Sequence, residues 1–494
     1  MDKLPNEGYY RVMNEQISLI PYPLSLKQEK GTFKTPKTFE LLLSKVEYSK
    51  AKEYNGFSLK NKEAYALVIS ARKILVLSSA KQGKFYAEQT LNQLFLSYKE
   101  EIPCLTICDK PEYEWRGFLL DTSRSFYSVA FIKKMLDIMA LHKFNVFHWH
   151  LTDDQGWRFE VPEYPKLVKV GSVRMDNTLP EEKYGVYDDR DPSKMFYTEK
   201  DIKDVINYAT KRCITIIPEV EFPGHVSALL ASYPELGCTG GPYKVENRWG
   251  IFPDVLCLGN DKIFKLYDAA ISTLARLFPG PYIHIGGDEC PHERWETCPK
   301  CKKRMKENHL SKSSELQSWG TSQIVKLVLK HNKIPIGWDE VLDNTDKIPV
   351  PAELTIQSWR GEEGGNTAVG LNHKVIMSPV THVYLNLKNK KDVEEPGRLG
   401  SITCQKAYSF SPFTKKMKKA QRPLVMGGEC CLWTEALPYS KSTEYLLFPR
   451  MCAVSESLWL PLEKKDFERF ENCLDVHKKR LHDLNFGYYD GGLK

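Results

Sequence analysis

Asp288 and Glu289 are adjacent carboxylates that follow two glycines in HIGGDEC, residues 284–290. Because neighbouring side chains on a strand point to opposite faces, both acids share one site only where a strand ends. Enzymes that cleave sugars with two carboxylates usually hold them roughly 5 to 9.5 Å apart, on opposite sides of the substrate. The adjacent pair does not fit that arrangement, so the roles of its two acids must differ from it.

Other residues suited to chemistry also follow short apolar runs. Eight such runs occur beyond residue 113: RGFLLD (116–121), FNVFHWHL (144–151), CITIIPEV (213–220), YIHIGGDE (282–289), IPIGWDE (334–340), LTIQSW (354–359), KVIMSP (374–379) and LVMGGECCLW (424–433). The polar and aromatic residues at their carboxyl ends are Asp121, Arg124, Asp153, Asp154, Glu219, Glu221, Asp288, Glu289, Trp338, Asp339, Trp359, Trp433 and Glu435. This shared position favours one acidic, aromatic-lined pocket over scattered structural roles.

Amphipathic stretches alternate with these runs, as in FIKKMLDIMALH, EKDIKDVINYATKR, KIFKLYDAAISTLARLF and SELQSWGTSQIVKLVLKH. Continuous apolar strands alternating with amphipathic helices indicate a parallel sheet covered by helices. Eight strands predict an α/β fold, the closed (β/α)8 TIM barrel, in which all strand ends meet at one mouth. A doubly wound open sheet is the competitor, but no GxGxxG follows an early strand.

A smaller unit precedes the barrel. EAYALVIS and KILVLSS alternate like half-buried strands, and GKFYAEQTLNQLFLSY has helical spacing. We therefore expect three parts: a small α+β domain over 1–112, the catalytic barrel over 113–460, and a C-terminal helical tail over 461–494 that packs on the barrel.

Composition excludes some partners. The net charge of +7 over 494 residues is modest, and its densest lysine run is Lys415, Lys416, Lys418 and Lys419, so no nucleic-acid partner is expected. No apolar stretch is long enough for a membrane span. MDKLPNEGYY lacks the apolar core of a signal peptide. We expect a cytoplasmic protein or, if a leader has been removed from this chain, a periplasmic or secreted one.

Thirteen cysteines are many for a cytosolic protein and few for a disulfide scaffold. Cys238 and Cys257 bracket a loop rich in Gly, Pro and Asn, which favours a loop-closing disulfide. Cys290, Cys298 and Cys301, with His292 or His309, are the alternative of a structural zinc site. A CxxC that occurs once is a weak signal, so disulfide or free thiols are favoured over zinc.

The pocket residues suit a sugar, since aromatic faces stack on sugar rings while carboxylates and an arginine bind hydroxyls. Phosphate chemistry is disfavoured because no glycine-rich loop precedes Lys-Ser/Thr. Metal hydrolysis through His148 and His150 of HWH lacks an accompanying HExxH, and histidines in an apolar strand are more often core or supporting residues. Serine hydrolysis lacks GxSxG.

The motifs WRGFLLDTSR, FNVFHWHLTDDQGWR, PEVEFPGH, HIGGDE, GWDE, QSW, YLN and LWTE run in this order from about 113 to 460. Together they resemble glycoside hydrolase family 20, the β-N-acetylhexosaminidases, and the first unit resembles the domain that precedes the barrel in that family. The resemblance implies removal of terminal, non-reducing β-linked N-acetylglucosamine or N-acetylgalactosamine with retention of configuration. It implies no cofactor and no metal in the site, and pairing into a homodimer is common among such barrels.

The resemblance also assigns the acid pair. Glu289 would be the general acid and then the base, with a pKa raised by burial and nearby negative charge. Asp288 would hold the N–H of the substrate's 2-acetamido group, whose oxygen attacks the anomeric carbon to form an oxazolinium intermediate. The substrate thus supplies the nucleophile, as the exceptions to the two-carboxylate scheme do.

The remaining roles follow by position. Tyr384 would donate to the acetamido carbonyl, and three tryptophans would enclose its methyl group and the ring: Trp338, Trp359 and Trp433. Arg124 and Glu435 would bind the hydroxyls at carbons 3 and 4. His225 would support Glu289 together with Asp153 or Asp154.

Two positions depart from the family pattern. Glu221 stands in EFPGH where aspartate is more usual, which would alter the surroundings of Glu289 modestly. Asn386 stands in YLN where many members have an aspartate that contacts the hydroxyl at carbon 6. Two anions in a partly dry pocket repel by several kcal/mol, so the neutral amide predicts tolerance of 6-sulfated N-acetylglucosamine. The competing interpretation is that Asn386 hydrogen-bonds a neutral hydroxyl.

Two further functions stay open at this point. A family member that releases a disaccharide, like a lacto-N-biosidase, needs a wider pocket, against which Arg124 and Glu435 argue. A non-catalytic sugar-binding barrel would be indicated by loss of Glu289, Asp288 or Tyr384, and all three are present.

Overall fold

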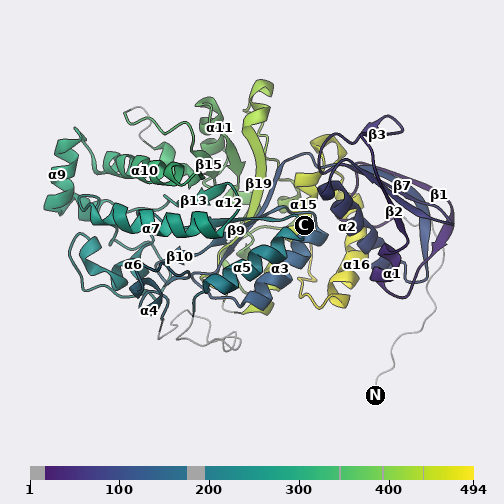
Figure 1. The fold of residues 1–494 in the computed structure, drawn as a ribbon, viewed down its shortest axis with the longest axis horizontal. Coiled ribbons are helices and arrows are strands. Elements are labelled where there is room, and N and C mark those ends of the chain that lie inside the picture. The colour runs from purple at the N-terminus through teal and green to yellow at the C-terminus, as the bar shows by residue number, and fades with distance from the viewer. Residues whose placement is uncertain (1–16, 175–194, 344–346, 392–393, 438, 494) are drawn as a thin grey trace, which may run out of the picture.

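The computed structural model describes residues 17–174, 195–343, 347–391, 394–437 and 439–493. The segment MDKLPNEGYY, on which the expectation about a leader rests, lies outside the described residues. Two bodies lie side by side in Figure 1: a smaller one built around a sheet at the right and a larger one built around a barrel.

The smaller body is a five-stranded sheet in the order β1–β7–β5–β6–β2. Its strands are β1 (Ser25–Lys34), β2 (Val46–Lys50), β5 (Tyr65–Ile69), β6 (Ile74–Ser78) and β7 (Glu101–Asp109). A short hairpin, β3 (Glu53–Tyr54) and β4 (Phe57–Ser58), and helix α1 (Phe39–Leu43) lie between β1 and β5. Helix α2 (Lys81–Ser97) covers one face, where Leu91 and Leu94 join Leu67 and Val76 in one buried cluster. This confirms the small α+β domain.

The larger body is a closed barrel of eight parallel strands. They are β8 (Trp115–Asp121), β9 (Val146–His150), β12 (Thr215–Glu219), β13 (Tyr282–His284), β14 (Ile334–Trp338), β15 (Thr355–Ser358), β16 (Val375–Met377) and β19 (Val425–Leu432). Every run predicted as a barrel strand overlaps one of them, so the predicted TIM barrel is confirmed. Because all eight pairs are parallel, the carboxyl ends meet at one mouth.

Helices surround the barrel, among them α3 (Val129–Leu141), α5 (Glu199–Thr210), α7 (Lys262–Leu277), α10 (Ser313–Lys330), α11 (Glu363–Gly370) and α15 (Arg450–Trp459). The first four coincide with the predicted amphipathic stretches. Helix α5 begins with a capping box in which Thr198 and Asp201 bond each other's backbone N–H, so its start is encoded locally. Strand β14 is followed by one turn of 3-10 helix (Asp339–Leu342).

The inward faces of the strands change character from the bottom of the barrel to its mouth. Trp115, Val146, Ile217, Ile336 and Ile376 form a separate apolar cluster at the amino ends. Two residues beyond the last four of these, the same face carries polar or aromatic groups: His148, Glu219, Trp338 and Ser378. The alternation of strand side chains therefore delivers polar groups to the mouth.

Buried ion pairs join the two bodies. Arg116 of β8 binds Glu63 at 2.7 Å, and Lys143 binds Asp109 of β7 at 3.0 Å, with all four side chains almost fully buried. The C-terminal helix α16 (Phe467–Asp483) lies beside α2 in Figure 1. Its Arg480 donates to Gln93 of α2. The charges are thus compensated across the interface, which fixes the smaller body to the barrel.

The cysteines correct one expectation. All thirteen are free, so Cys238 and Cys257 do not form the expected disulfide. A disulfide needs sulfurs about 2.05 Å apart, whereas the Sγ of Cys257 lies 3.6 Å from Cys298 and 3.7 Å from Cys301. Cys290 and His292 do not join these thiols: the backbone of Cys290 packs on Gly224, and His292 bonds Gln317 at 2.8 Å.

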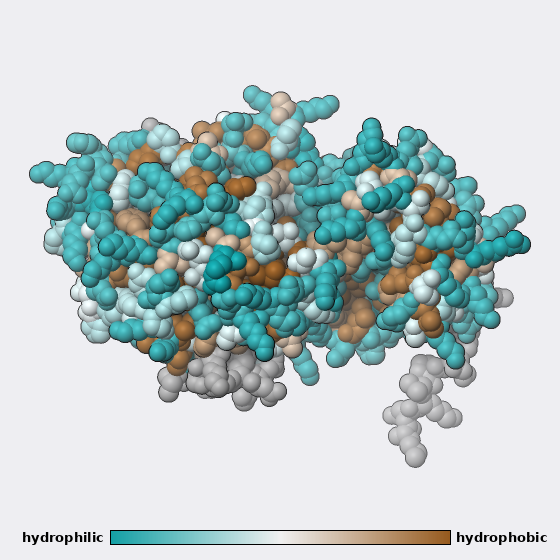
Figure 2. All heavy atoms as spheres, in the orientation of Figure 1, coloured by the Kyte–Doolittle hydropathy of each residue, from teal (hydrophilic) through white to brown (hydrophobic). Residues whose placement is uncertain are grey.

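No helix in the described ranges is both long and apolar enough to cross a membrane. The face in Figure 2 is mostly hydrophilic, with apolar residues in small separate patches.

Candidate active site

A tight turn after β13 brings the two acids together. The strand ends at His284, and Gly286, Gly287 and Glu289 all have positive φ, at 65°, 109° and 43°. A Cβ on Gly286 would lie 1.9 Å from Oε2 of Glu221, so this position needs a glycine twice over. The turn, rather than the alternation of a strand, places Asp288 and Glu289 side by side at the barrel mouth. The left-handed φ of Glu289 is uncommon for a non-glycine residue and is typical of functional sites.

The two acids have different surroundings. The Asp288 side chain is 13% exposed and its Oδ1 has no hydrogen-bond partner among the described residues. Burial and the nearby negative charge of Glu289 raise the pKa of Asp288 to about 6, against the opposing effect of His225. The Glu289 side chain is 37% exposed, and polar contact with His225 lowers its pKa. The expectation of a raised pKa at Glu289 is therefore wrong for the site without a sugar, because the polar contact with His225, aided by its charge, outweighs burial.

His225 connects the acid pair to two aspartates. Its Nδ1 donates to Asp154 at 3.0 Å and lies 3.4 Å from Asp153, so both candidate aspartates reach it. Its Nε2 lies 3.5 Å from Glu289 and 3.8 Å from Asp288. Burial opposes the charge, but Asp153 and the hydrogen bonds around the ring raise the pKa of His225 well above its usual value. His225 is thus a cation that lies between two pairs of carboxylates, Asp153 with Asp154 and Asp288 with Glu289. Its backbone φ is also positive, at 51°.

Arg124 follows β8 at the barrel mouth. Its guanidinium binds Asp153 at 2.8 Å and Asp121 at 3.3 Å, and it lies over the Trp433 ring at 5.1 Å. Burial opposes the charge, but the carboxylates around it, Asp153 foremost, raise the pKa of Arg124 well above its usual value. The Nε atom is buried and has no partner in the part of the chain that the structure describes. Arg124 therefore has a donor available for a ligand.

Aromatic rings form the walls and floor. Trp338 and Trp433 have ring centroids 5.8 Å apart, Trp433 and Tyr384 6.2 Å, and Tyr384 and Trp359 6.0 Å with nearly parallel planes. Trp338 is almost fully buried, with its Nε1 donating to Glu219 at 2.9 Å. Trp359 donates to Glu340 at 2.9 Å. The four predicted aromatic residues thus form one continuous group, fixed by hydrogen bonds at both ends.

Glu435 and Asn386 complete the mouth on the side of β19. Glu435 binds Arg398 at 3.1 Å through one carboxylate oxygen, while its other oxygen is buried without a partner among the residues described. Asn386 is 1% exposed, and neither its amide nitrogen nor its amide oxygen has a described partner. Its backbone carbonyl accepts from the N–H of Arg398 at 2.9 Å.

Glu221 lies behind the acid pair and does not contact Glu289 in any described hydrogen bond or ion pair. Its carboxyl is buried against Gly286. Burial and the charges of Asp288 and Glu219 raise the pKa of Glu221 well above its usual value, which favours the neutral carboxyl. The predicted supporting position is thus occupied by an acid whose surroundings disfavour its charged form.

The histidines of HWH hold carboxylates in the barrel interior. His148 lies 2.8 Å from Glu429 and 3.2 Å from Glu219, and His150 lies 2.8 Å from Asp153. Each imidazole nitrogen thus faces a carboxylate of the chain itself. These contacts fit histidines that support neighbouring carboxylates.

Three residues near the site carry no assigned role in the sequence interpretation. Glu340 bonds Trp359, and burial together with the charge of Asp288 raises its pKa to about 9. Its signal was present in GWDE. Arg398 contacts Glu435 from a distant, irregular segment with no motif. The sequence marks Glu219 only as a strand-end residue, because its three histidine neighbours come from two other strands, β9 and β13.

A cavity of about 390 Å³ opens beside Glu289. Ile251, Cys290, Gln317 and Glu340 are among its lining residues. It gives the mouth a second compartment next to the more exposed of the two acids.

The barrel and its acidic, aromatic mouth define a carbohydrate-active enzyme of the barrel class. Residues 113–462 match the model of the glycosyl hydrolase family 20 catalytic domain, and residues 45–110 match that of glycosyl hydrolase family 20, domain 2. The chain therefore belongs to glycosyl hydrolase family 20.

Relatives and solved structures agree with this assignment. A β-hexosaminidase of Porphyromonas gingivalis is 40% identical over 86% of this chain, which spans about half (54%) of that protein. A β-hexosaminidase of Akkermansia muciniphila is 33% identical over 94% of this chain and 90% of its own length. The family 20 exo-β-N-acetylglucosaminidase of Vibrio harveyi, solved with N-acetylglucosamine, superposes with a TM-score of 0.84 at 26% identity, covering 98% of this chain and 81% of that one. The chain is thus similar to β-hexosaminidases over both of its domains.

Proposed function

We propose that this chain is a retaining exo-β-N-acetylhexosaminidase that removes terminal, non-reducing β-linked N-acetylglucosamine or N-acetylgalactosamine. The observation that supports this most strongly is the set of buried polar atoms without partners at the mouth. Among the described residues these include Asp288 Oδ1, Arg124 Nε, Glu435 Oε2 and the Asn386 amide. Buried polar groups are normally hydrogen-bonded, so a ligand with several hydroxyl and amide groups is the natural source of the missing partners.

Asp288 is the acceptor for the acetamido N–H in this proposal. Its free Oδ1 and small exposure suit a single, desolvated hydrogen bond, and ionisation above a pKa of about 6 leaves it anionic at neutral pH. The Tyr384 hydroxyl, whose pKa is raised by burial, stays protonated and donates to the acetamido carbonyl. Held from both ends, the amide oxygen attacks the anomeric carbon of its own sugar, which gains the advantage of an intramolecular reaction.

Glu289 protonates the leaving oxygen and then activates water. It is the more exposed acid, and it faces the cavity of about 390 Å³, which would take the leaving group. Binding of a sugar removes water from Glu289 and adds an N–H donor to Asp288, which raises the pKa of the first and lowers that of the second. Substrate binding thus favours protonation of Glu289 and ionisation of Asp288.

The remaining groups bind the sugar. Arg124 and Glu435 bind the hydroxyls at carbons 3 and 4 on one side, and the rings of Trp338, Trp359 and Trp433 enclose the acetamido methyl and the sugar face. The ion pair of Glu435 with Arg398 closes this end of the mouth, which suits a single terminal sugar.

Activity on chromogenic glycosides tests the proposal. The chain should release 4-nitrophenol from the β-N-acetylglucosaminide and the β-N-acetylgalactosaminide, and none from the β-glucoside, which lacks the acetamido nucleophile. From a longer glycan it should release single sugars. Comparable hydrolysis of the β-glucoside would refute substrate assistance, and release of a disaccharide would refute the single-sugar pocket.

We further propose that the enzyme accepts 6-sulfated N-acetylglucosamine. Asn386 supports this because its buried amide is neutral and has no described partner. Arg398, a cation, lies in the neighbouring backbone segment, where its backbone N–H donates to the Asn386 carbonyl. An aspartate at 386 would repel a sulfate by several kcal/mol at intermediate dielectric.

The test compares sulfated and unsulfated substrates in one variant. Asn386→Asp should lower kcat/KM for the 6-sulfated substrate much more than for the unsulfated one. Asn386→Ser, which keeps a neutral hydrogen-bonding group, is the matched control and should preserve the ratio. An unchanged ratio in Asn386→Asp would mean that Asn386 serves a neutral hydroxyl only.

A further inference from the structure

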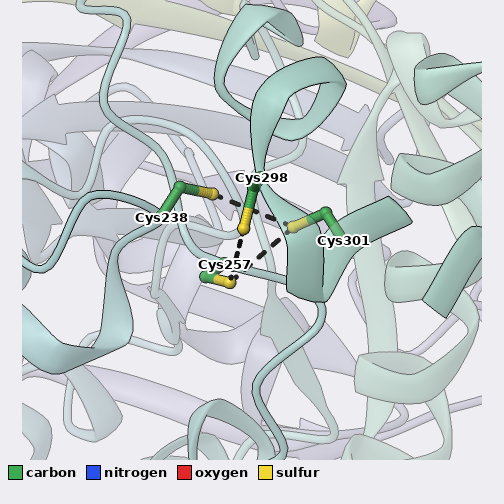
Figure 3. Close-up of side chains that lie close together, drawn as sticks. All are labelled: Cys238, Cys257, Cys298 and Cys301. Atoms are coloured by element: carbon green, nitrogen blue, oxygen red, sulfur yellow. Dashed lines mark hydrogen bonds between the residues drawn. The ribbon is translucent and has the colours of Figure 1, made fainter. Parts of the chain in front are cut away.

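Four cysteines outside the active site converge on one point (Figure 3). The Sγ of Cys238 lies 3.8 Å from that of Cys301, and the Sγ of Cys257 lies 3.6 Å from Cys298 and 3.7 Å from Cys301. All four sulfurs lie within 4.8 Å of one another. Cys257, Cys298 and Cys301 are buried and Cys238 is partly buried. Four thiols thus share one site with no other kind of ligand among them.

The spacing of the sulfurs matches a tetrahedral metal site. Four sulfurs that each lie about 2.3 Å from a central zinc are about 3.8 Å from one another, close to the three distances above. Disulfides require about 2.05 Å. A tetrahedral set of four thiolates favours zinc or iron, and zinc with four cysteines is a common structural site. We propose that Cys238, Cys257, Cys298 and Cys301 bind one structural Zn²⁺ ion.

The surrounding chain is shaped for this approach. Cys298 is the N-cap of α9 (Pro299–Glu307) and Cys301 lies in its first turn, so the CPKC segment presents both sulfurs at the helix start. A Cβ on Gly259 would lie 2.2 Å from the Lys300 carbonyl carbon and 2.7 Å from the Cys301 nitrogen. Only a glycine there lets the segment after Cys257 pack against the CPKC turn.

The local charge also suits the occupied site. Four thiolates and one Zn²⁺ carry a net charge of −2. Helix α9 has the sequence PKCKKRMKE, which supplies five cations in nine residues, and its positive N-terminal end points at the sulfurs. The cations and the helix end therefore offset the negative charge of the cluster.

The proposed zinc joins the two segments that carry the catalytic groups. Cys238 and Cys257 come from the chain that follows His225, and Cys298 and Cys301 from the chain that follows Glu289. Further contacts run in parallel: Trp295 donates to the Leu256 carbonyl at 2.8 Å, and Arg294 binds Asp254 at 2.8 Å. The metal would hold these two loops together without touching substrate, so its role is structural and independent of the proposed activity.

Metal analysis of the full chain tests the site. After purification without chelators, elemental analysis should find about one zinc per chain, and X-ray absorption at the zinc edge should show four sulfur neighbours at about 2.3 Å. Cys257→Ser combined with Cys301→Ser should reduce the zinc content to near zero. Cys108→Ser, which alters a thiol in β7 of the small domain, is the matched control and should retain the zinc.

The wild-type chain alone also decides the question if the double variant does not fold. After removal of metal by a chelator under reducing conditions, added Co²⁺ should give the intense visible bands of tetrahedral thiolate coordination, and Zn²⁺ should displace them. Added Zn²⁺ should also raise the melting temperature of the metal-free chain. Absence of zinc with no uptake, nitrogen or oxygen in the metal shell, zinc retained by the double variant, or disulfides among these four cysteines would each overturn the proposal.

Discussion

His225 sets the protonation of the acid pair, and its charge can be removed without a large change of shape. The variant His225→Gln keeps hydrogen-bonding capacity but deletes the positive charge 3.5 Å from Glu289 and 3.8 Å from Asp288. Loss of a nearby cation makes both carboxylates less stable as anions. Both pKa values of the pair should therefore rise.

The size of the change follows from the distance. A unit charge at 3.5 Å contributes about 1.2 kcal/mol at a dielectric constant of 80 and about 4.7 kcal/mol at 20. More than a third of the Glu289 side chain is exposed, so solvent screening favours the lower figure. At about 1.4 kcal/mol per pH unit, the expected shift is about one unit.

The assay is the pH dependence of kcat/KM, which reports the pair in the free enzyme as two macroscopic pKa values. Activity requires one acid ionised and the other protonated, so the profile is bell-shaped. Both limbs should move to higher pH by about one unit in His225→Gln. His331→Gln, which alters a histidine at the end of α10 that pairs with Asp268 of α7, is the control and should leave the profile in place.

A profile for His225→Gln that loses amplitude without moving would refute this reasoning. It would mean that His225 is neutral, or that its charge does not reach the acids. A shift to lower pH would have the wrong sign for removal of a cation.

Three further substitutions test the remaining assignments. Glu289→Gln should lower kcat by roughly 10²–10⁴-fold on a disaccharide, but far less on a 2,4-dinitrophenyl glycoside, whose leaving group needs no proton; equal losses would contradict the acid role. Asp288→Asn should lower kcat by roughly 10²–10³-fold on every acetamido substrate, and full activity would contradict the role of Asp288 as acceptor of the acetamido N–H. Glu221→Gln should raise the melting temperature at pH 7. In the wild-type chain the raised pKa favours a neutral carboxyl in the folded state, whereas the unfolded chain ionises it above its usual pKa of 4.5. The folded state of the wild-type chain therefore loses stability as pH rises from 4.5 towards the raised folded pKa, and the substitution removes this loss. This gain should vanish near pH 4.5, and a gain independent of pH would contradict a raised pKa.

The barrel was predictable because its signal is local and repeated. The sequence FNVFHWHL alternates so that Val146, His148 and His150 share one face, which the barrel turns inward. The site residues were predictable for a related reason: each follows a strand, and parallel strands bring their ends to one mouth. Motifs such as HIGGDE then needed no knowledge of long-range contacts to identify the acids.

Properties that depend on contacts between distant segments were not predictable. The lowered pKa of Glu289 depends on a cation that approaches from another loop. The contact of Arg398 with Glu435 has no periodic or motif signal, since 37 residues separate the two. The cysteine cluster unites Cys238 with Cys301, 63 residues away, and its sequence signal was divided between a loop that resembled a disulfide loop and one CxxC.

Glu219 and Glu221 offer the strictest test of the electrostatic argument, because the same substitution two residues apart should act in opposite directions. Glu219 accepts from Trp338 at 2.9 Å and lies 2.8 Å from His284 and 3.2 Å from His148. Burial opposes ionisation, but the surrounding histidines hold the pKa of Glu219 well below its usual value. Its charge therefore fixes the Trp338 ring that forms the floor of the site.

Glu219→Gln leaves buried imidazolium charge without its partner, a defect that costs about 3–5 kcal/mol. It should lower the denaturant midpoint of the barrel at pH 7, and the loosened Trp338 should raise KM as well. Glu221→Gln removes a carboxyl whose surroundings disfavour its charged form and should raise the midpoint. Two shifts of the same sign would show that the two buried carboxyls share one charge state, and would remove the basis for treating Glu219 as the anion that supports the floor.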